Sequence, residues 1–258
     1  MGHGEEVRYE LLRPEQAVRR RKACPLAYLP LGGIEWHGVQ NPLGLDGLKA
    51  HELCVRAAKR GGGVVFPVPW YGEMRDLFLA EANAPVRPRV AGAMQWSSQN
   101  FRKGHLGAKT VSAQALFYQE LLFHVYYQIR SLSFGALYVL VGHGPLKNYA
   151  VLAAEVFERD TGVRTDVSYA SELVEGYQED HAALFETGVM MAVRPELVDL
   201  AALPRGDPSE LIGISGKDPR QGALEHGRKF VSECVDRLAE RAGKLLDRRA
   251  STGSMQVR

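Results

Sequence analysis

Cysteine is scarce in this sequence: only Cys24, Cys54 and Cys234 occur among 258 residues. No two of them form a CxxC pair, and an odd number of cysteines argues against a disulfide framework. This usage is typical of proteins from a reducing compartment, so we expect a cytoplasmic location.

Long apolar segments and a strong excess of charge are also lacking. The chain has no run of about 18 apolar residues, and its first 16 residues are charged and contain no apolar signal segment. The formal net charge is +2, which argues against a protein built to bind phosphate backbones. We therefore expect neither a membrane association nor a nucleic-acid partner.

The composition that is present is ordinary for a globular protein, with 45% hydrophobic and 24% charged residues. A chain of this length buries a sizeable core without the support of disulfides. No internal repeat and no low-complexity linker is evident. We expect a single domain over residues 1–248, followed by a flexible tail over residues 249–258.

Short apolar runs alternate with longer segments of helical periodicity. The expected strands are residues 27–31, 64–68, 136–141 and 165–169, and the expected helices are 48–60, 112–130, 148–159 and 220–248. This alternation predicts an α/β fold with three layers, α/β/α, around a mainly parallel sheet. Residues 73–111 are the least regular stretch, and such a long loop is usually functional or mobile.

The segment LPLGGIEWHGVQNPLGLDG, residues 29–47, carries Glu35, His37 and Asp46 directly after an expected strand. In an extended chain, residues two apart share a face, so Glu35 and His37 can point the same way. Carboxylates with imidazole suit zinc, manganese or a similar ion, although a solvated polar turn is the alternative. His143 follows another strand end. Alone it is more typical of a structural histidine, but from there it can meet the first cluster.

A third segment, EDHAALFETG at residues 179–188, places Asp180, His181 and Glu186 in one acidic patch. A histidine beside a carboxylate can serve as a proton shuttle or a metal ligand. The alternative is an ordinary helix N-terminus, where acidic residues are favoured by the helix dipole.

These segments together resemble the creatininase family of metal-dependent amidohydrolases. Its E-x-H-G pattern with a later Asp is similar to Glu35, His37, Gly38 and Asp46, and its N-G-H motif after a strand is similar to residues 141–143. Its E-T-S motif and the following apolar segment resemble residues 186–200, and its late G-x-x-G-D-P motif with E-x-G-R resembles residues 213–228 with one extra residue. The resemblance covers roughly residues 25–248.

The resemblance implies ions at the carboxyl end of the sheet that activate a water for attack on an amide carbon. Glu35, Asp46 and His143 would hold one metal, and His37 and Asp46 would hold a second, with Asp46 bridging. The adjacent Asp180 and His181 would correspond to the acidic-His pair that handles protons near the leaving group. The expected cofactor is zinc or manganese, as one or two divalent ions.

The chain departs from the family at the glutamate that usually completes the second metal site. The two positions where relatives carry it are Pro145 and Leu184 here, and neither side chain binds a cation. Either Glu186, Asp180 or Glu73 substitutes, with Glu186 the first choice and Asp180 the second, or the second site is weak, or the protein holds one metal.

The expected substrate-binding residues are Trp36, Tyr71, Glu73 and His105. The family's Y-G-x-S-x-E-H loop keeps Tyr71-Gly72 here, but Glu73-Met74-Arg75-Asp76 follow, which leaves the substrate open. His105 stands near a pocket loop of the family. Trp36 must point away from its two neighbours, and it either lines the pocket or packs beneath the metal.

We therefore predict a metal-dependent hydrolase that cleaves a C–N bond of a small cyclic or simple amide, with His181 transferring a proton to the leaving nitrogen. One alternative is the same machinery acting on a cyclic ketone sugar, a formamide or a peptide. Another is a metal-depleted, non-catalytic binding subunit. Because the family commonly forms hexamers, a homo-oligomer is expected, with the aromatic-rich helix LLFHVYYQI as a candidate contact.

Overall fold

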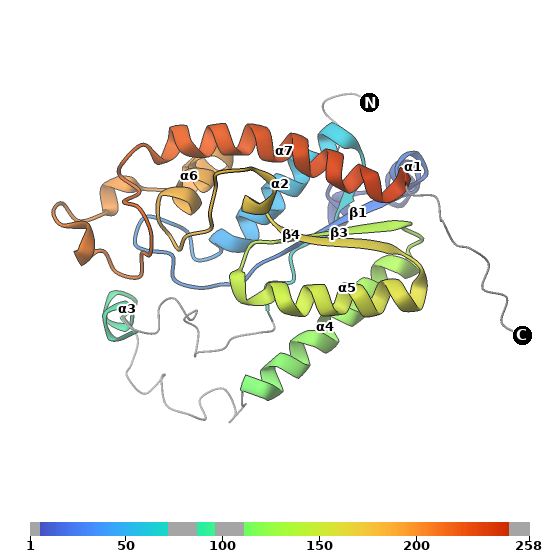
Figure 1. Ribbon diagram of the computed structural model, residues 1–258, viewed down its shortest axis with the longest axis horizontal. Helices are drawn as coiled ribbons and strands as arrows, with labels where there is room; N and C mark the ends of the chain where they lie inside the picture. The colour runs from blue at the N-terminus through green and yellow to red at the C-terminus, as the bar shows by residue number, and fades with distance from the viewer. Residues whose placement is uncertain (1–5, 72–86, 96–110, 248–258) are drawn as a thin grey trace, which may run out of the picture.

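The computed structural model describes residues 6–71, 87–95 and 111–247 (Figure 1). Its sheet has four strands, β1 (Leu26–Leu31), β2 (Val64–Val65), β3 (Ala136–Val141) and β4 (Arg164–Tyr169). All neighbouring strands are parallel, in the order β2-β1-β3-β4. The predicted parallel sheet is thereby confirmed.

Helices cover both faces of this sheet (Figure 1). On one side lie α2 (Leu45–Gly61), α6 (Leu184–Val193) and α7 (Ala223–Asp247), and on the other lie α4 (Val111–Ser131) and α5 (Lys147–Thr161). The two further helices are α1 (Pro14–Ala23) and α3 (Arg87–Ala93). The three-layer α/β/α architecture is confirmed.

Two cores, one on each face, hold the layers together. Alternate residues of a strand point to opposite faces, so Tyr28 and Tyr138 pack in the core that contains α2, α6 and α7. Leu29 and Val139, the next residues along β1 and β3, pack in the core that contains α4 and α5. Because both faces are buried, the central strands read as continuous apolar runs.

The boundaries differ from the expected ones at informative places. The helix expected at residues 48–60 begins three residues earlier, at Leu45, so Asp46 lies in its first turn. The strand expected at 64–68 pairs only at Val64–Val65, where Pro67 and Pro69 follow, and proline has no N–H to donate to a ladder. The irregular stretch 73–111 contains the short helix α3.

The segment LLFHVYYQI is not an exposed apolar face. Leu122, Tyr126 and Ile129 are buried in the core between α4 and the sheet, whereas His124 is exposed. The buried stripe therefore packs within the subunit, and a subunit contact through the exposed side chains of this segment, His124 and Tyr127 among them, stays a prediction.

Within the ranges described, no helix combines the length and the apolar character needed to cross a membrane. The expected tail at 249–258 lies outside the described residues.

Candidate metal centre

Three segments converge at the carboxyl ends of the neighbouring strands β1 and β3. Glu35 and His37 lie in the loop that follows β1, and Asp46 lies in the first turn of α2. His143 lies two residues after the end of β3, with Gly142 between them. Ligands from distant parts of the sequence are thus placed together by strand order, as expected for a parallel sheet.

Close backbone contact brings the first turn of α2 against the strand ends. A Cβ atom on Gly142 would lie 2.1 Å from the Asp46 carbonyl oxygen, and one on Gly32 would lie 2.2 Å from the Gly47 amide nitrogen. Any side chain at these two positions would push α2, and Asp46 with it, away from the sheet.

We therefore expect Gly142→Ala to lower stability by about 1–3 kcal/mol, the usual cost of overpacking, and to weaken metal binding by displacing Asp46. Thermal unfolding and metal titration measure the two effects. The matched control is Gly144→Ala, because a Cβ on Gly144 would lie 4.0 Å from the Tyr169 hydroxyl, an ordinary van der Waals distance. Equal behaviour of the two variants would contradict the close-contact explanation.

The first group of potential ligands consists of Glu35, Asp46 and His143. His143 Nδ1 lies 2.9 Å from Glu35 Oε1 and 2.9 Å from Asp46 Oδ2. Two ligand atoms that are each about 2.1 Å from a zinc ion lie roughly 3 Å apart or slightly more. The spacing is therefore close to that of a bound ion, with the three residues drawn slightly inward.

The second group consists of His37, Asp46 and Glu186. His37 Nε2 lies 3.2 Å from Asp46 Oδ1 and 3.7 Å from Glu186 Oε2. Asp46 thus directs one carboxylate oxygen toward each histidine, which is the geometry of a bridging ligand. Glu186 was the first-choice substitute for the missing glutamate, and it is the acid that the fold brings to this position.

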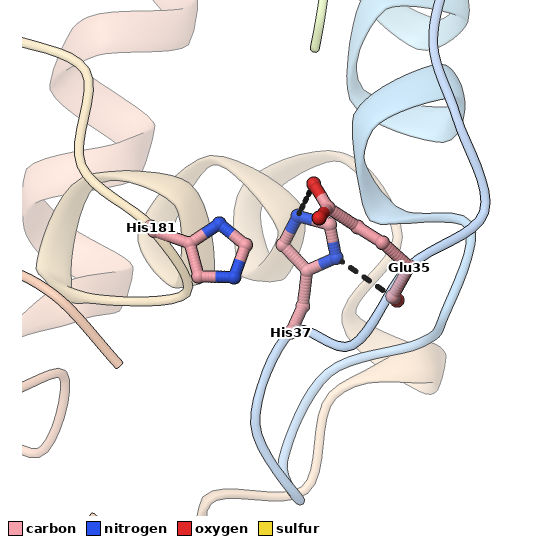
Figure 2. Close-up of side chains that lie close together, drawn as sticks. All are labelled: Glu35, His37 and His181. Atoms are coloured by element: carbon pink, nitrogen blue, oxygen red, sulfur yellow. Dashed lines mark hydrogen bonds and ion pairs between the residues drawn. The ribbon is translucent and has the colours of Figure 1, made fainter. Parts of the chain in front are cut away.

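The loop itself orients the His37 ring. Its Nδ1 lies 3.3 Å from the Glu35 carbonyl oxygen, and because a carbonyl can only accept, Nδ1 carries the hydrogen (Figure 2). Nε2 then faces the carboxylates. A hydrogen bond of this kind on the other ring nitrogen is the usual way in which a metal-binding histidine is held in place.

Buried polar atoms support the presence of a cation. Glu35 is only 6% exposed, and its Oε2 has no hydrogen-bond partner among the described residues. An orphaned carboxylate oxygen costs free energy unless a cation or a donor satisfies it. The carboxylates of Glu35, Asp46 and Glu186, together with two histidine imidazoles, form a donor set suited to zinc or manganese.

Without a bound ion, the imidazole rings of His37 and His143 are protonated at neutral pH. Burial alone would lower the pKa of each histidine, but Asp46 and the other nearby acids raise the pKa of His37 to about 9 and that of His143 to about 10. Burial would raise the pKa of Asp46, but His37 and His143 hold it well below its usual range. Each histidine therefore stabilises the metal-free fold fully below its ordinary pKa, and this stability is lost as the pH rises through about 9 to 10.

At about pH 7.5, metal binding should accordingly release one proton from each histidine ring that becomes a ligand, because only neutral imidazole binds a metal. Calorimetric titration of the metal-free protein with Mn²⁺ or Zn²⁺ in buffers of different ionisation enthalpy measures this release. Affinity should rise with pH up to about pH 9. A binding enthalpy that is the same in all buffers would contradict this prediction.

His181 lies beside the centre and is half-buried. Its ring is 4.7 Å from that of His37, centroid to centroid, and Figure 2 shows His37 between it and Glu35. His181 Nε2 lies 3.0 Å from the Trp36 carbonyl oxygen, so Nε2 carries the hydrogen and Nδ1 is the atom that can accept a proton. Glu35, His37 and His181 also form a third possible ligand group.

Asp180 is placed at the amino end of α6. Its carboxylate accepts the N–H groups of Phe185 at 2.8 Å and Glu186 at 3.1 Å. Burial, followed by the charge of Glu186, raises the pKa of Asp180 to about 6. The helix-start interpretation of this segment is thus correct for Asp180, and a role in proton transfer remains a prediction.

Sequence reasoning missed Lys49, which is 1% exposed. Its Nζ lies 2.7 Å from Glu186 Oε1 and 3.4 Å from Glu179 Oε2. Burial alone would lower the pKa of Lys49, but Glu186 and Glu179 raise it, so the ammonium is charged. The available signal was its spacing, because a residue three positions after Asp46 lies on the same helix face.

The expected substrate-binding residues have separate outcomes. The Trp36 indole is 5% exposed, donates to the Ile212 carbonyl at 2.9 Å and packs against Val90. Tyr71 is 75% exposed. Glu73 and His105 lie outside the described residues.

Comparison with known proteins agrees with this arrangement. Residues 10–242 match the family model of creatininase, creatinine amidohydrolase. The creatinine amidohydrolase of Pseudomonas putida is 24% identical over 252 residues, which cover 90% of this chain and 94% of that protein.

Solved creatininase structures share the fold. A manganese form, described as creatininase Mn, superposes with a TM-score of 0.68 at 19% identity, covering 93% of this chain and 98% of that one. A mutant creatininase of Zn-Zn type has a TM-score of 0.69 at 18% identity with the same coverage. Since the family model spans most of the chain, this protein belongs to the creatininase family and is a hydrolase.

Proposed function

We propose that this enzyme hydrolyses a C–N bond of a small cyclic or simple amide, in the manner of creatinine amidohydrolase. The observation that carries the proposal is the pair of ligand groups that share Asp46. Glu35, Asp46 and His143 would hold one zinc or manganese ion, and His37, Asp46 and Glu186 would hold a second. Bound there, such ions supply Lewis acidity and a nucleophile derived from water at neutral pH.

We assign the proton transfer of this reaction to His181. Its Nε2–H is engaged by the Trp36 carbonyl, which fixes the ring plane beside His37. Nδ1 then serves as the proton carrier, and half-burial leaves the ring accessible to a substrate. In this role His181 delivers a proton to the nitrogen that departs when the C–N bond breaks.

Two alternatives share part of this basis. A non-catalytic subunit was suggested by the lost glutamate, and the position of Glu186 beside His37 and Asp46 removes that support. Opening of a cyclic ketone sugar uses the same centre on a different bond, as does cleavage of a formamide or a peptide.

A substrate panel tests the choice among bonds. Mn²⁺- or Zn²⁺-loaded protein is incubated with creatinine, other cyclic amides, formamide, a dipeptide and a cyclic ketone sugar, and product formation is followed by chromatography. We expect turnover of a cyclic or simple amide that is abolished in Asp46→Asn. Turnover of the ketone, of formamide or of the dipeptide, without turnover of any other amide, would overturn the proposal.

We propose that the protein is a homo-oligomer, with a hexamer as the expected size. The support is a set of large apolar side chains left exposed on α4 and α5: Leu116 at 70%, Phe117 at 59% and Leu152 at 52%. Such residues gather at subunit contacts more often than on free surfaces. Light scattering that shows a monomer across micromolar concentrations would contradict this.

A cytoplasmic location is also proposed. Cys24, Cys54 and Cys234 are all free and buried, as is typical of proteins kept in a reducing compartment. Cell fractionation of the native protein tests it.

A further inference from the structure

The two ligand groups are unequal in charge because of Lys49. This lysine projects from α2, the helix that supplies Asp46, and its ammonium is buried against the Glu186 carboxylate at 2.7 Å. No comparable cation contacts the first group, Glu35, Asp46 and His143, among the ion pairs found in the described residues.

Both oxygens of Glu186 already have donors. Oε1 accepts from Lys49, and Oε2 accepts the Ala182 N–H at 2.8 Å while facing His37 Nε2 at 3.7 Å. Ala182 has a φ of 55°, in the left-handed region, and its carbonyl accepts from Gln40, which holds this N–H in place. An ion at the second group would therefore share Glu186 with a fixed positive charge.

The charges around the two groups are unequal. Glu35, Asp46 and Glu186 carry the negative charges of the ligand groups, and Asp180, whose carboxylate accepts the Glu186 N–H at 3.1 Å, adds another beside Glu186. The Lys49 ammonium contacts Glu186 Oε1 directly, at 2.7 Å, whereas Glu179, the other acid on Lys49, is 29% exposed and 3.4 Å away, so solvent screens its contribution more strongly. An ion at the second group is therefore repelled by the Lys49 ammonium at short range, and an ion at the first group is repelled much less.

We infer that Lys49 is a positioning residue that sets the metal stoichiometry of this centre. The group of Glu35, Asp46 and His143 binds one divalent ion tightly. The group of His37, Asp46 and Glu186 binds its ion much more weakly, because the charged Lys49 is hydrogen-bonded to the Glu186 carboxylate. This inference rests on the proposed metal centre, and it assigns a role to a residue outside the ligand set.

The test is a titration of metal-free full-length protein with Mn²⁺ alone, by calorimetry and by elemental analysis after desalting. Wild type should retain about one ion per chain, with a second ion bound at least about 100-fold more weakly. Lys49→Met should tighten the second ion by about 10- to 100-fold and change the first much less. Electron paramagnetic resonance of the manganese should then show a coupled pair at lower total metal than in wild type.

Controls separate charge from packing. Lys49→Gln removes the charge but keeps a donor for Glu186, and it should behave like Lys49→Met, which also covers the case where the apolar variant does not fold. Glu179→Gln leaves the Lys49–Glu186 pair intact and should keep the unequal binding of wild type.

Equal and tight binding of two ions by wild type would overturn the inference. So would a Lys49→Gln variant that binds the second ion no better or loses it, because Lys49 would then assist Glu186 as a ligand. Unequal metal binding without amide hydrolysis would contradict only the proposed reaction. Amide hydrolysis with two equally tight ions would contradict only the role of Lys49.

Discussion

Replacing Asp46 by asparagine is expected to remove most of the bound metal and to reduce hydrolysis by about 10³-fold or more, or about 4 kcal/mol of transition-state stabilisation. The reason is that Asp46 faces both histidines, with Oδ1 toward His37 and Oδ2 toward His143. Losing its charge weakens both ligand groups at once, whereas any other single ligand belongs mainly to one.

Metal content by elemental analysis and melting temperature with and without added Mn²⁺ measure this effect. Wild type should be stabilised by metal through mass action, and Asp46→Asn should not be. The control is Asp166→Asn on β4, which removes the carboxylate that pairs with Arg241 of α7 and should leave metal binding unchanged. Wild-type metal content and wild-type melting behaviour in Asp46→Asn would show that Asp46 is not a ligand.

Replacing His181 by glutamine is expected to lower kcat by about 10²- to 10⁴-fold while leaving metal content intact. Glutamine keeps a polar side chain beside the Trp36 carbonyl but cannot carry a proton at neutral pH. His226→Gln is the control, because His226 lies on α7, packs against Tyr177 and takes no part in the ligand groups found among the described residues.

Metal content decides between two roles of His181. It lies close enough to Glu35 and His37 to form a ligand group with them. If His181→Gln loses metal in proportion to activity, the side chain is a ligand and the proposed proton transfer is wrong. If metal is retained and substrate binding is little changed while kcat falls, proton transfer is supported.

Much of the fold could be predicted because both faces of the sheet are buried. Continuous apolar runs located β1 and β3 to within a residue, and the long helices followed from apolar spacing. Strand β4 was also located to within a residue, although most of its side chains are only half-buried. Helix α1 was not expected, since none of its residues is buried and it therefore has no apolar stripe. The start of α2 was placed too late because its first turn carries Asp46 and Gly47, a polar and a small residue that do not continue the apolar spacing of the helix.

The sequence by itself determined which chemical groups are present, with Glu35, His37 and Asp46 after one strand end and His143 after another. That these residues can meet follows from the parallel sheet and the rule that its carboxyl ends share one edge. Their division into two metal groups came from the resemblance to the creatininase family. Only the tertiary structure decided which acid meets His37. Glu186 reaches it from α6 through a capped turn, and a buried lysine from α2 contacts the same carboxylate. Contacts between helices that are more than 100 residues apart depend on packing and not on local pattern, so spacing along the chain cannot reveal them.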